Sequence, residues 1–351
     1  MQELKDCFVF SNYINAWTIQ KGLAKLGISL NVVSHTKGLM SLSPRTPGKG
    51  GWLFFTEESN LLRYYDIQEY RFYPRELDKS LIDDKFAFAQ ALTAMGEHPI
   101  VSWDFKSVDL CQTLELPIYL KAKHSWSGTR KLPRGYLCDT LKDLERAVKH
   151  IESQDMPATL FFFQRLLPGD EKNNVSTCGF FDYRNARRNV IAVTQKVLST
   201  EGKIGLGSIV ETVQDPATLI PRTYHILTTL RYTGPFELEF LYDARDQTYY
   251  VLELNPRFWM QHGIFIEGYE NRVIRAYLEL DEASEWYTEE TPFQPLAWVN
   301  QVDFLRAIKR RNVAQLKVYA DTYKKQRQGA IKVLGYPTFT KAFQHLVRGF
   351  L

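Results

Sequence analysis

The chain has 351 residues, 44% of them hydrophobic and 24% charged, with a formal net charge of +4, which is typical of a globular protein long enough for two or three packed units. Lysine and arginine residues are scattered rather than clustered, which argues against a nucleic-acid partner but is compatible with an anionic substrate such as a phosphate. No segment approaches the ~20 consecutive apolar residues that cross a bilayer, and the start MQELKDCFVFSNY is too acidic for a signal peptide, so no membrane association is expected.

The first hundred residues alternate short apolar runs with helical patterns. The runs CFVFS and ISLNVVS predict two strands, and the segment between them predicts a helix that stops at Gly27. The segment DDKFAFAQALTAMGEHPIVSW predicts a capped helix that carries Lys85, then a glycine stop and a further strand. This alternation predicts a doubly wound α/β unit with a parallel sheet.

Between residues 106 and 166 the pattern changes to short strands and turns, followed by the charged helix LKDLERAVKHIESQ. A strongly apolar strand, FFFQR, comes next and ends at the turn Pro168-Gly169. The simplest interpretation is a small α+β lobe that ends at a turn.

The remainder of the chain combines strands with helical segments. Residues 170 to 290 are expected to form strands around the helical segment PATLIPRTYHILTTLRYTG. The tail WVNQVDFLRAIKRRNVAQLKVYADTYKKQRQ has helical periodicity and many basic positions. We interpret its basic face as solvated, with an anion or partner site as the alternative.

The segment FELEFLYDARDQTYYVLELNPRFWM predicts a β-hairpin with acids on both strands. With the turn centred near Asp246, Glu239 faces Glu253 and Glu237 faces Asn255. These four side chains share one face, because side chains along a strand alternate with period two. Opposed like charges destabilise an antiparallel pair, so a cation is expected between them, and carboxylate and amide oxygens suit magnesium. The alternative is a solvent-facing hairpin edge on which the glutamates are hydrated.

Two weaker signals indicate a phosphate site and a hinge. Lys121 precedes the small-residue loop HSWSGTRK, in which Gly128 lets backbone N–H groups approach an anion. The Pro168-Gly169 turn suits a hinge whose backbone reads an adenine edge while Glu171 reaches a ribose hydroxyl. An exposed strand lysine and an ordinary turn are the alternatives. Neither a P-loop nor a GxGxxG fingerprint is present in the sequence.

Taken in chain order, these features resemble the ATP-grasp superfamily, in which the nucleotide is held between two α+β lobes. The segment YTGPFELEFLYDARDQTYYVLELNPRFW carries the resemblance, because it looks like the second acidic strand of that superfamily followed by its E-x-N-P-R segment. The segments GKIGLGSIVETVQDP and DDKFAFAQALTAMGEHPIV also fit the usual layout. The resemblance covers roughly residues 80 to 270 and, more loosely, the α/β unit that precedes them.

The resemblance implies an α/β protein with an N-terminal Rossmann-like (pre-ATP-grasp) domain, two α+β lobes that clasp ATP and a helical C-terminal extension. The expected N-terminal domain and small lobe are residues 1–105 and 106–166. The expected large lobe with the metal site and the helical extension are residues 167–290 and 291–351.

The resemblance also implies roles for individual residues. Lys121 and Lys85 are expected on the phosphates of ATP, the residues from Gln164 to Leu167 around the adenine, and Glu171 on the ribose. The complete cofactor-binding set is Lys85, Lys121, Gly128, Gln164, Arg165, Leu166, Leu167 and Glu171. The implied magnesium ligands are Glu239, Glu253 and Asn255. Asn255 and Arg257 are the implied catalytic residues, and Arg257 would steady the transferred γ-phosphoryl group.

The chain departs from the pattern of the superfamily at several positions. Arg165 stands where relatives often have glutamate, and Met260 stands where many have glycine. His262 is a candidate for orienting a substrate, with a structural hydrogen-bonding role as the alternative. The cluster DYRNARRN offers Arg184, Arg187 and Arg188 for an acidic substrate, or forms a charged hairpin turn.

The activity that the resemblance implies is ATP-dependent carboxylate-amine ligation through an acyl phosphate, with release of ADP and phosphate. The expected cofactors are ATP and Mg²⁺, and the expected partners are small carboxylates and amines of amino-acid or peptide type, with a homodimer suggested by analogy. A kinase with the same fold and a non-catalytic nucleotide-binding module are the alternatives. The four cysteines, Cys7, Cys111, Cys138 and Cys178, show no CxxC spacing, which argues against zinc and disulfides and favours the cytoplasm.

Overall fold

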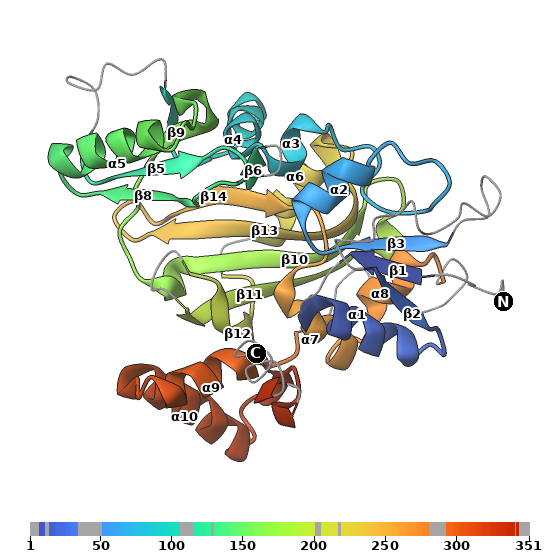
Figure 1. Ribbon diagram of the computed structural model, residues 1–351. Helices are drawn as coiled ribbons and strands as arrows, with labels where there is room; N and C mark the ends of the chain where they lie inside the picture. Colours follow the sequence, from blue (N-terminus) through green and yellow to red (C-terminus); the bar gives the residue numbers. More distant parts are fainter. Residues whose placement is uncertain are drawn as a thin grey trace. The chain divides into compact units, whose positions relative to one another are not determined.

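The protein has a mixed α/β fold, described here from a computed structural model (Figure 1). The described residues are 7–10, 14–33, 51–105, 115–127, 130–200, 205–216, 219–280, 293–340 and 342–343. They divide into two compact units, and each unit is built from segments that are not contiguous in the sequence. Unit 1 comprises Met1–Glu76, Asp170–Glu237 and Asn255–Leu351, and unit 2 comprises Leu77–Gly169 and Leu238–Leu254.

Unit 1 begins with a three-stranded parallel sheet in the order β2-β1-β3. Its strands are β1 (Cys7–Phe10), β2 (Leu30–Val33) and β3 (Trp52–Phe55). Helix α1 (Ile14–Ala24) connects the first two strands and ends before Gly27, whose φ of +72° suits glycine. The predicted strand, helix and strand are therefore confirmed. Helix α2 (Glu58–Tyr64) follows β3.

A seven-stranded sheet has the order β14-β13-β10-β11-β12-β15-β16. Its first five strands along the chain are β10 (Asn174–Asp182), β11 (Val190–Ser199), β12 (Gly207–Val213), β13 (Thr233–Asp243) and β14 (Thr248–Asn255). The helices that accompany them in unit 1 are α6 (Leu219–Thr229), α7 (Gly263–Glu267) and α8 (Arg272–Tyr277). Every residue of β10 is buried, which explains why this strand does not alternate in hydrophobicity.

The C-terminal segment differs from its prediction as a helical extension. It contributes β15 (Leu296–Asn300) and β16 (Lys332–Tyr336), and the helices α9 (Gln301–Lys309) and α10 (Val313–Arg327) lie between them along the chain. The helical prediction was therefore wrong for Trp298 and its neighbours. Trp298 is fully buried opposite Val210 of β12. Pairing in the sheet therefore stabilises this short apolar run more than a helical conformation would.

One apolar core in unit 1 joins elements that are far apart in sequence. It contains Val9 of β1, Leu23 of α1 and Phe54 of β3, together with Phe180 of β10 and Tyr277 of α8. At roughly 25 cal/mol per Å² of buried apolar surface, such clusters supply the main driving force for folding. The N-terminal sheet is thus part of unit 1 and shares its core.

Unit 2 is built on a four-stranded sheet in the order β4-β9-β5-β8. Its strands are β4 (Ser102–Asp104), β5 (Ile118–Ala122), β8 (Gly135–Cys138) and β9 (Phe161–Arg165). Its helices are α3 (Ser80–Asp83), α4 (Lys85–Ala94) and α5 (Leu141–Ser153). Helix α5 has a Thr140 and Asp143 capping box, and it buries Leu144 and Ile151 in the core of this unit.

Unit 2 is wider than the predicted small lobe of residues 106–166. Strand β4 pairs with β9, so that Trp103 lies opposite Phe163. The backbone of Val251, in β14, exchanges hydrogen bonds with His98 and Ile100. Through these pairings, unit 2 includes residues that precede and residues that follow the predicted lobe in sequence. Local sequence patterns do not indicate such pairings between distant segments.

The shorter elements complete the description. The hairpin strands β6 (Trp126–Ser127) and β7 (Arg130–Lys131) pair antiparallel. The 3-10 helices are η3 (Ala158–Leu160), η4 (Glu171–Asn173), η5 (Ala186–Arg188) and η7 (Met260–His262). Within the described ranges, no helix is both long enough and apolar enough to cross a bilayer.

Candidate functional site

The hairpin of β13 and β14 carries the polar side chains that the sequence singled out. Asn255 Nδ2 donates a 3.0 Å hydrogen bond to Glu237 Oε2, which confirms that these two residues lie side by side as the mirrored hairpin predicted. Glu239 and Glu253 belong to unit 2, and their direct opposition stays a prediction. Glu253 and Asn255 are two positions apart in β14, so they share one face of the strand.

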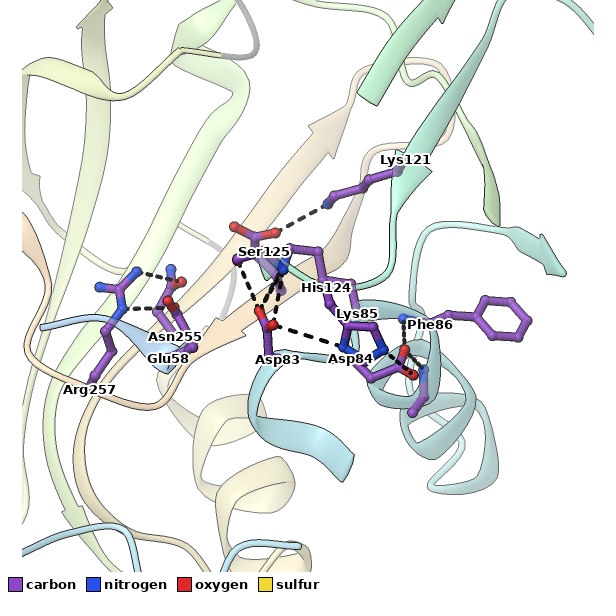
Figure 2. Close-up of polar contacts among 12 residues, drawn as sticks. Glu58, Asp83, Asp84, Lys85, Phe86, Lys121, His124, Ser125, Asn255 and Arg257 are labelled. Atoms are coloured by element: carbon purple, nitrogen blue, oxygen red, sulfur yellow. Dashed lines mark hydrogen bonds and ion pairs between the residues drawn. The ribbon is translucent and has the colours of Figure 1, made fainter. Parts of the chain in front are cut away.

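Lys121 forms an ion pair with Glu253 within unit 2. Its Nζ lies 3.2 Å from Glu253 Oε2, and its side chain is only 10% exposed (Figure 2). The predicted phosphate-binding lysine thus contacts one of the predicted magnesium ligands. A nearly buried ammonium requires such a partner, because removing one member of a buried pair leaves the other charge uncompensated.

A second polar cluster surrounds Asp83, at the end of α3. Its carboxylate accepts hydrogen bonds from the backbone N–H of Ser125, at 3.1 and 2.9 Å, and from Ser125 Oγ, at 2.9 Å. Lys85 Nζ lies 3.7 Å from the same carboxylate (Figure 2). Asp84 caps α4 by accepting from two backbone N–H groups, which fixes the start of the helix at Lys85. The sequence analysis identified Lys85 but missed Asp83.

Arg257 is held by an acid that the sequence analysis also missed. Its Nε lies 2.7 Å from Glu58 Oε1, in the first turn of α2, and its Nη2 donates to Asn255 Oδ1 at 3.2 Å (Figure 2). The backbone N–H of Phe258 donates to the carbonyl of Phe55, at the end of β3. Glu58 follows β3, whose apolar run WLFF was not interpreted as a strand in the sequence analysis. That run was the available signal, because side chains just after the strands of α/β units often meet ligands.

The predicted adenine strand is β9. Gln164 is 5% exposed and donates to Ser102 Oγ at 3.3 Å, while the backbone N–H of Arg165 donates to the Val101 carbonyl. Leu167 is buried and Leu166 is partly exposed. Glu171 lies in η4, which an Asp170 and Asn173 capping box stabilises. The two compact units divide between Gly169 and Asp170, directly after the Pro168-Gly169 turn, and a hinge at this turn stays a prediction. Gly128 lies outside the described residues.

Comparison with known proteins gives no match to a family model and no match to a curated protein by sequence. Solved structures do match. An L-amino acid ligase from Bacillus licheniformis has a TM-score of 0.55 and 12% identity, with 77% of this chain and 74% of that chain covered. A RimK domain protein ATP-grasp from Sphaerobacter thermophilus has a TM-score of 0.54 and 15% identity, with coverages of 78% and 98%. The chain has the ATP-grasp fold.

The third structure is the biotin carboxylase domain of a 2-oxoglutarate carboxylase from Hydrogenobacter thermophilus. Its TM-score is 0.57 at 13% identity, and 82% of this chain and 72% of that chain are covered. It was solved in complex with ADP, MgADP and bicarbonate. At sequence identities this low, the structural similarity establishes the ATP-grasp fold alone. The substrates of this chain must be inferred from its own residues.

The donor set predicted for magnesium in this ATP-grasp fold is chemically suitable. Glu239, Glu253 and Asn255 offer oxygen ligands, which hard divalent cations prefer. Among the residues that the structure describes, no group of three or more His, Cys, Asp or Glu side chains is arranged to hold a metal ion. The predicted set has only two carboxylates, from Glu239 and Glu253, and its third ligand is the amide of Asn255. It is therefore not a group of the kind just described, and its binding of magnesium stays a prediction.

His262 lies in the core of unit 1. It is 1% exposed, and its ring contacts Phe258 and Trp259. Its Nδ1 lies within hydrogen-bonding distance of the Trp259 carbonyl, and burial lowers its pKa to about 4, which makes it neutral at pH 7. This environment favours the structural alternative over contact with a substrate.

The arginine cluster after β10 divides into buried and exposed members. Arg188 is 7% exposed, pairs with Asp182 Oδ2 at 2.7 Å and donates to the Ala276 carbonyl at 2.6 Å. Arg184 pairs with Glu76 at the surface, and Arg187 is exposed. Arg188 is therefore engaged within the fold, which favours the charged-turn alternative. Substrate contact by Arg184 and Arg187 stays a prediction.

Proposed function

We propose that this protein is an ATP- and Mg²⁺-dependent ligase that joins a small carboxylate to an amine through an acyl phosphate and releases ADP and phosphate. The ATP-grasp fold supports the use of ATP. The observation that carries the proposal further is the ion pair between Lys121 and Glu253. The proposal also includes a cytoplasmic location and small-molecule substrates.

The ion pair fits a site that is poised for a metal-bound nucleotide. MgATP carries both an anion and a cation, so Lys121 would hold a phosphate in place of Glu253, and Glu253 would hold magnesium in place of Lys121. Both protein charges would stay compensated in either state, which avoids the cost of leaving the nearly buried Lys121 charge unpaired. An ordinary surface ion pair has no such reason to hold a lysine that is only 10% exposed.

The other residues have complementary roles in the proposed site. Lys85 would contact the phosphates, Gln164 to Leu167 the base and Glu171 the ribose. Glu239, Glu253 and Asn255 would hold magnesium, which neutralises charge on the phosphoryl oxygens when it is bound. Arg257, held by Glu58, would present its guanidinium to the γ-phosphoryl group.

The proposed reaction has two steps. A carboxylate oxygen of the first substrate attacks the γ-phosphorus, and the bond to ADP breaks. The amine nitrogen of the second substrate then attacks the acyl carbon, phosphate leaves with the bonding electrons, and the nitrogen loses a proton to the departing phosphate or to water. Positioning and charge neutralisation are sufficient for both steps, so no protein nucleophile is required. Because one structural neighbour is an L-amino acid ligase, amino acids and dipeptides are the first candidate substrates.

The test is ADP release by the purified protein with ATP and magnesium, screened against pooled amino acids and dipeptides, with mass spectrometry of the products. A pool that raises ADP and yields two components joined with loss of water supports the proposal. ADP together with a phosphorylated hydroxyl compound would replace it with a kinase. Failure to bind ATP at all would overturn it. The Glu253→Gln variant is the matched negative control.

A further inference from the structure

Asn255 is the last residue of β14, and the nitrogen and the oxygen of its side-chain amide have separate partners. The Nδ2 atom donates a 3.0 Å hydrogen bond to Glu237 Oε2 on β13. The Oδ1 atom accepts a 3.2 Å hydrogen bond from Arg257 Nη2 (Figure 2). Asn255 is 8% exposed, and all three residues belong to unit 1.

Both partners require the same orientation of the Asn255 amide. An ionised carboxylate offers only acceptors, so Glu237 can pair with the amide nitrogen and not with the amide oxygen. A guanidinium offers only donors, so Arg257 can pair with the amide oxygen and not with the nitrogen. If the amide turned over, two acceptors would meet at Glu237 and two donors at Arg257. Glu237 therefore determines which atom of the amide points away from it.

Arg257 is itself held in place, so the amide is oriented between two fixed groups. Its Nε lies 2.7 Å from Glu58 Oε1, and the two side chains are 18% and 15% exposed. Its backbone N–H donates to the backbone carbonyl of Asn255 at 2.9 Å. Glu58, Arg257, Asn255 and Glu237 therefore form a continuous row of hydrogen bonds within unit 1, with an acid at each end.

We propose that Glu237 is a positioning residue that orients the Asn255 amide so that its Oδ1 is presented to magnesium. This inference rests on the proposed function, in which Asn255 is a magnesium ligand. An amide oxygen has two lone pairs, so Oδ1 can accept from Arg257 and also contact a cation. Glu237 does not touch the metal in this proposal. It acts through Asn255, as groups that hydrogen-bond to metal ligands do.

Metal affinity gives the first test, by calorimetric titration of Mg²⁺ into the full-length protein saturated with a non-hydrolysable ATP analogue. Glu237→Leu removes the acceptor, and we expect the Kd for Mg²⁺ to rise about tenfold or more, because a metal ligand loses the group that orients it. Glu237→Gln keeps an oxygen that can accept from Asn255 Nδ2, so its Kd should stay within about threefold of the wild-type value. The Kd for the analogue in the presence of a chelator should be unchanged in both variants.

The two variants separate orientation from charge. Both remove the negative charge of Glu237, but only glutamine keeps an acceptor for the amide of Asn255. Equal losses of Mg²⁺ affinity in both variants would show an effect of charge alone and would overturn the proposal. A wild-type Kd in a folded Glu237→Leu variant would also overturn it. The matched control is Glu57→Gln, because Glu57 Oε2 likewise accepts from an asparagine amide, Asn60 Nδ2, at 3.4 Å, and its Kd for Mg²⁺ should equal the wild-type value.

An exchange of the two side chains tests their hydrogen bond in the ligand-free protein. Asn255→Asp places a second carboxylate beside Glu237, so this variant should melt several degrees below the wild type, because like charges on neighbouring strands repel. Adding Glu237→Gln to the same chain should restore most of the loss, because the glutamine amide can donate to the new carboxylate. A double variant that melts no higher than Asn255→Asp alone would contradict the orienting contact.

The two measurements distinguish this inference from the proposed function. If the wild-type protein binds no nucleotide, the proposed function fails and the metal role of Glu237 fails with it, while the melting temperatures still decide whether Glu237 orients Asn255. If the wild-type protein binds Mg²⁺ and nucleotide but Glu237→Leu binds Mg²⁺ equally well, the role of Glu237 is overturned and the ligase proposal stands.

Discussion

Lys121 Nζ lies 3.2 Å from Glu253 Oε2, and this ion pair joins strand β5 to strand β14 through a lysine that is 10% exposed and a glutamate that is 22% exposed. The two residues are 132 positions apart in sequence, and both were singled out independently, one as a phosphate contact and the other as a metal ligand. Their contact makes the behaviour of each depend on the other, and this dependence can be measured.

Glu253→Gln is expected to lower Mg²⁺-dependent turnover at least about 100-fold, because a metal ligand is lost. The same change removes the carboxylate from Lys121, so affinity for metal-free ATP should be retained or increase several-fold. Calorimetry with Mg²⁺ and with a chelator separates the two effects. Glu211→Gln is the control, because it breaks a Glu–Lys pair of similar length, with Lys325, outside the proposed site. Normal turnover in Glu253→Gln would contradict the metal assignment.

Glu58→Gln is expected to reduce kcat about tenfold or more while changing the KM for ATP little. Its carboxylate holds Arg257 Nε at 2.7 Å, and a looser guanidinium stabilises a developing phosphoryl charge less well. Steady-state kinetics of the ligase or ATPase reaction gives the measurement. Glu57→Gln, at the neighbouring position, is the control, and equal kinetics in both variants would show that Glu58 does not position Arg257.

His262 is expected to make the protein less stable in acid. Burial lowers its pKa in the folded state to about 4, from an ordinary value of 6.5. Between these values the unfolded chain binds a proton that the folded protein excludes, so the free energy of unfolding falls by roughly 3 kcal/mol as the pH drops from 6.5 through 4. Denaturant unfolding at several pH values should show a shallower acid loss in His262→Gln. His150→Asn, on an exposed helix position, should leave the wild-type slope unchanged.

Arg188→Ala is expected to cost about 3–5 kcal/mol in the free energy of unfolding, because the buried Asp182 carboxylate loses its cationic partner. Arg184→Ala, which removes a cation that is 60% exposed, should cost less than about 1 kcal/mol. Chemical denaturation of both variants gives the comparison. A small loss in Arg188→Ala, combined with a raised KM for an acidic substrate, would instead assign Arg188 to the substrate.

Local sequence patterns determined many of the elements of this protein. The caps and periodicity of α4 and α5, the apolar run of β9 and the glycine after α1 each predicted an element that is observed, because these signals depend on neighbouring residues alone. The mirrored spacing of the hairpin placed Glu237 beside Asn255, because the turn fixes the register of two adjacent strands. The ATP-grasp fold was implied by the resemblance of the hairpin and the E-x-N-P-R segment that follows it to that superfamily, and the solved structures support it.

Only the tertiary structure decided the contacts between distant segments. Asp83 contacts Ser125, which is 42 positions away in sequence, and Glu58 contacts Arg257, which is 199 positions away. Trp298 lies in a strand because its segment pairs with β12. The pairing of β4 with β9 likewise joins segments that are about 60 positions apart in sequence. A local pattern specifies which face of an element is apolar, but the partner of that face, and of each buried charge, is chosen by packing over the whole chain.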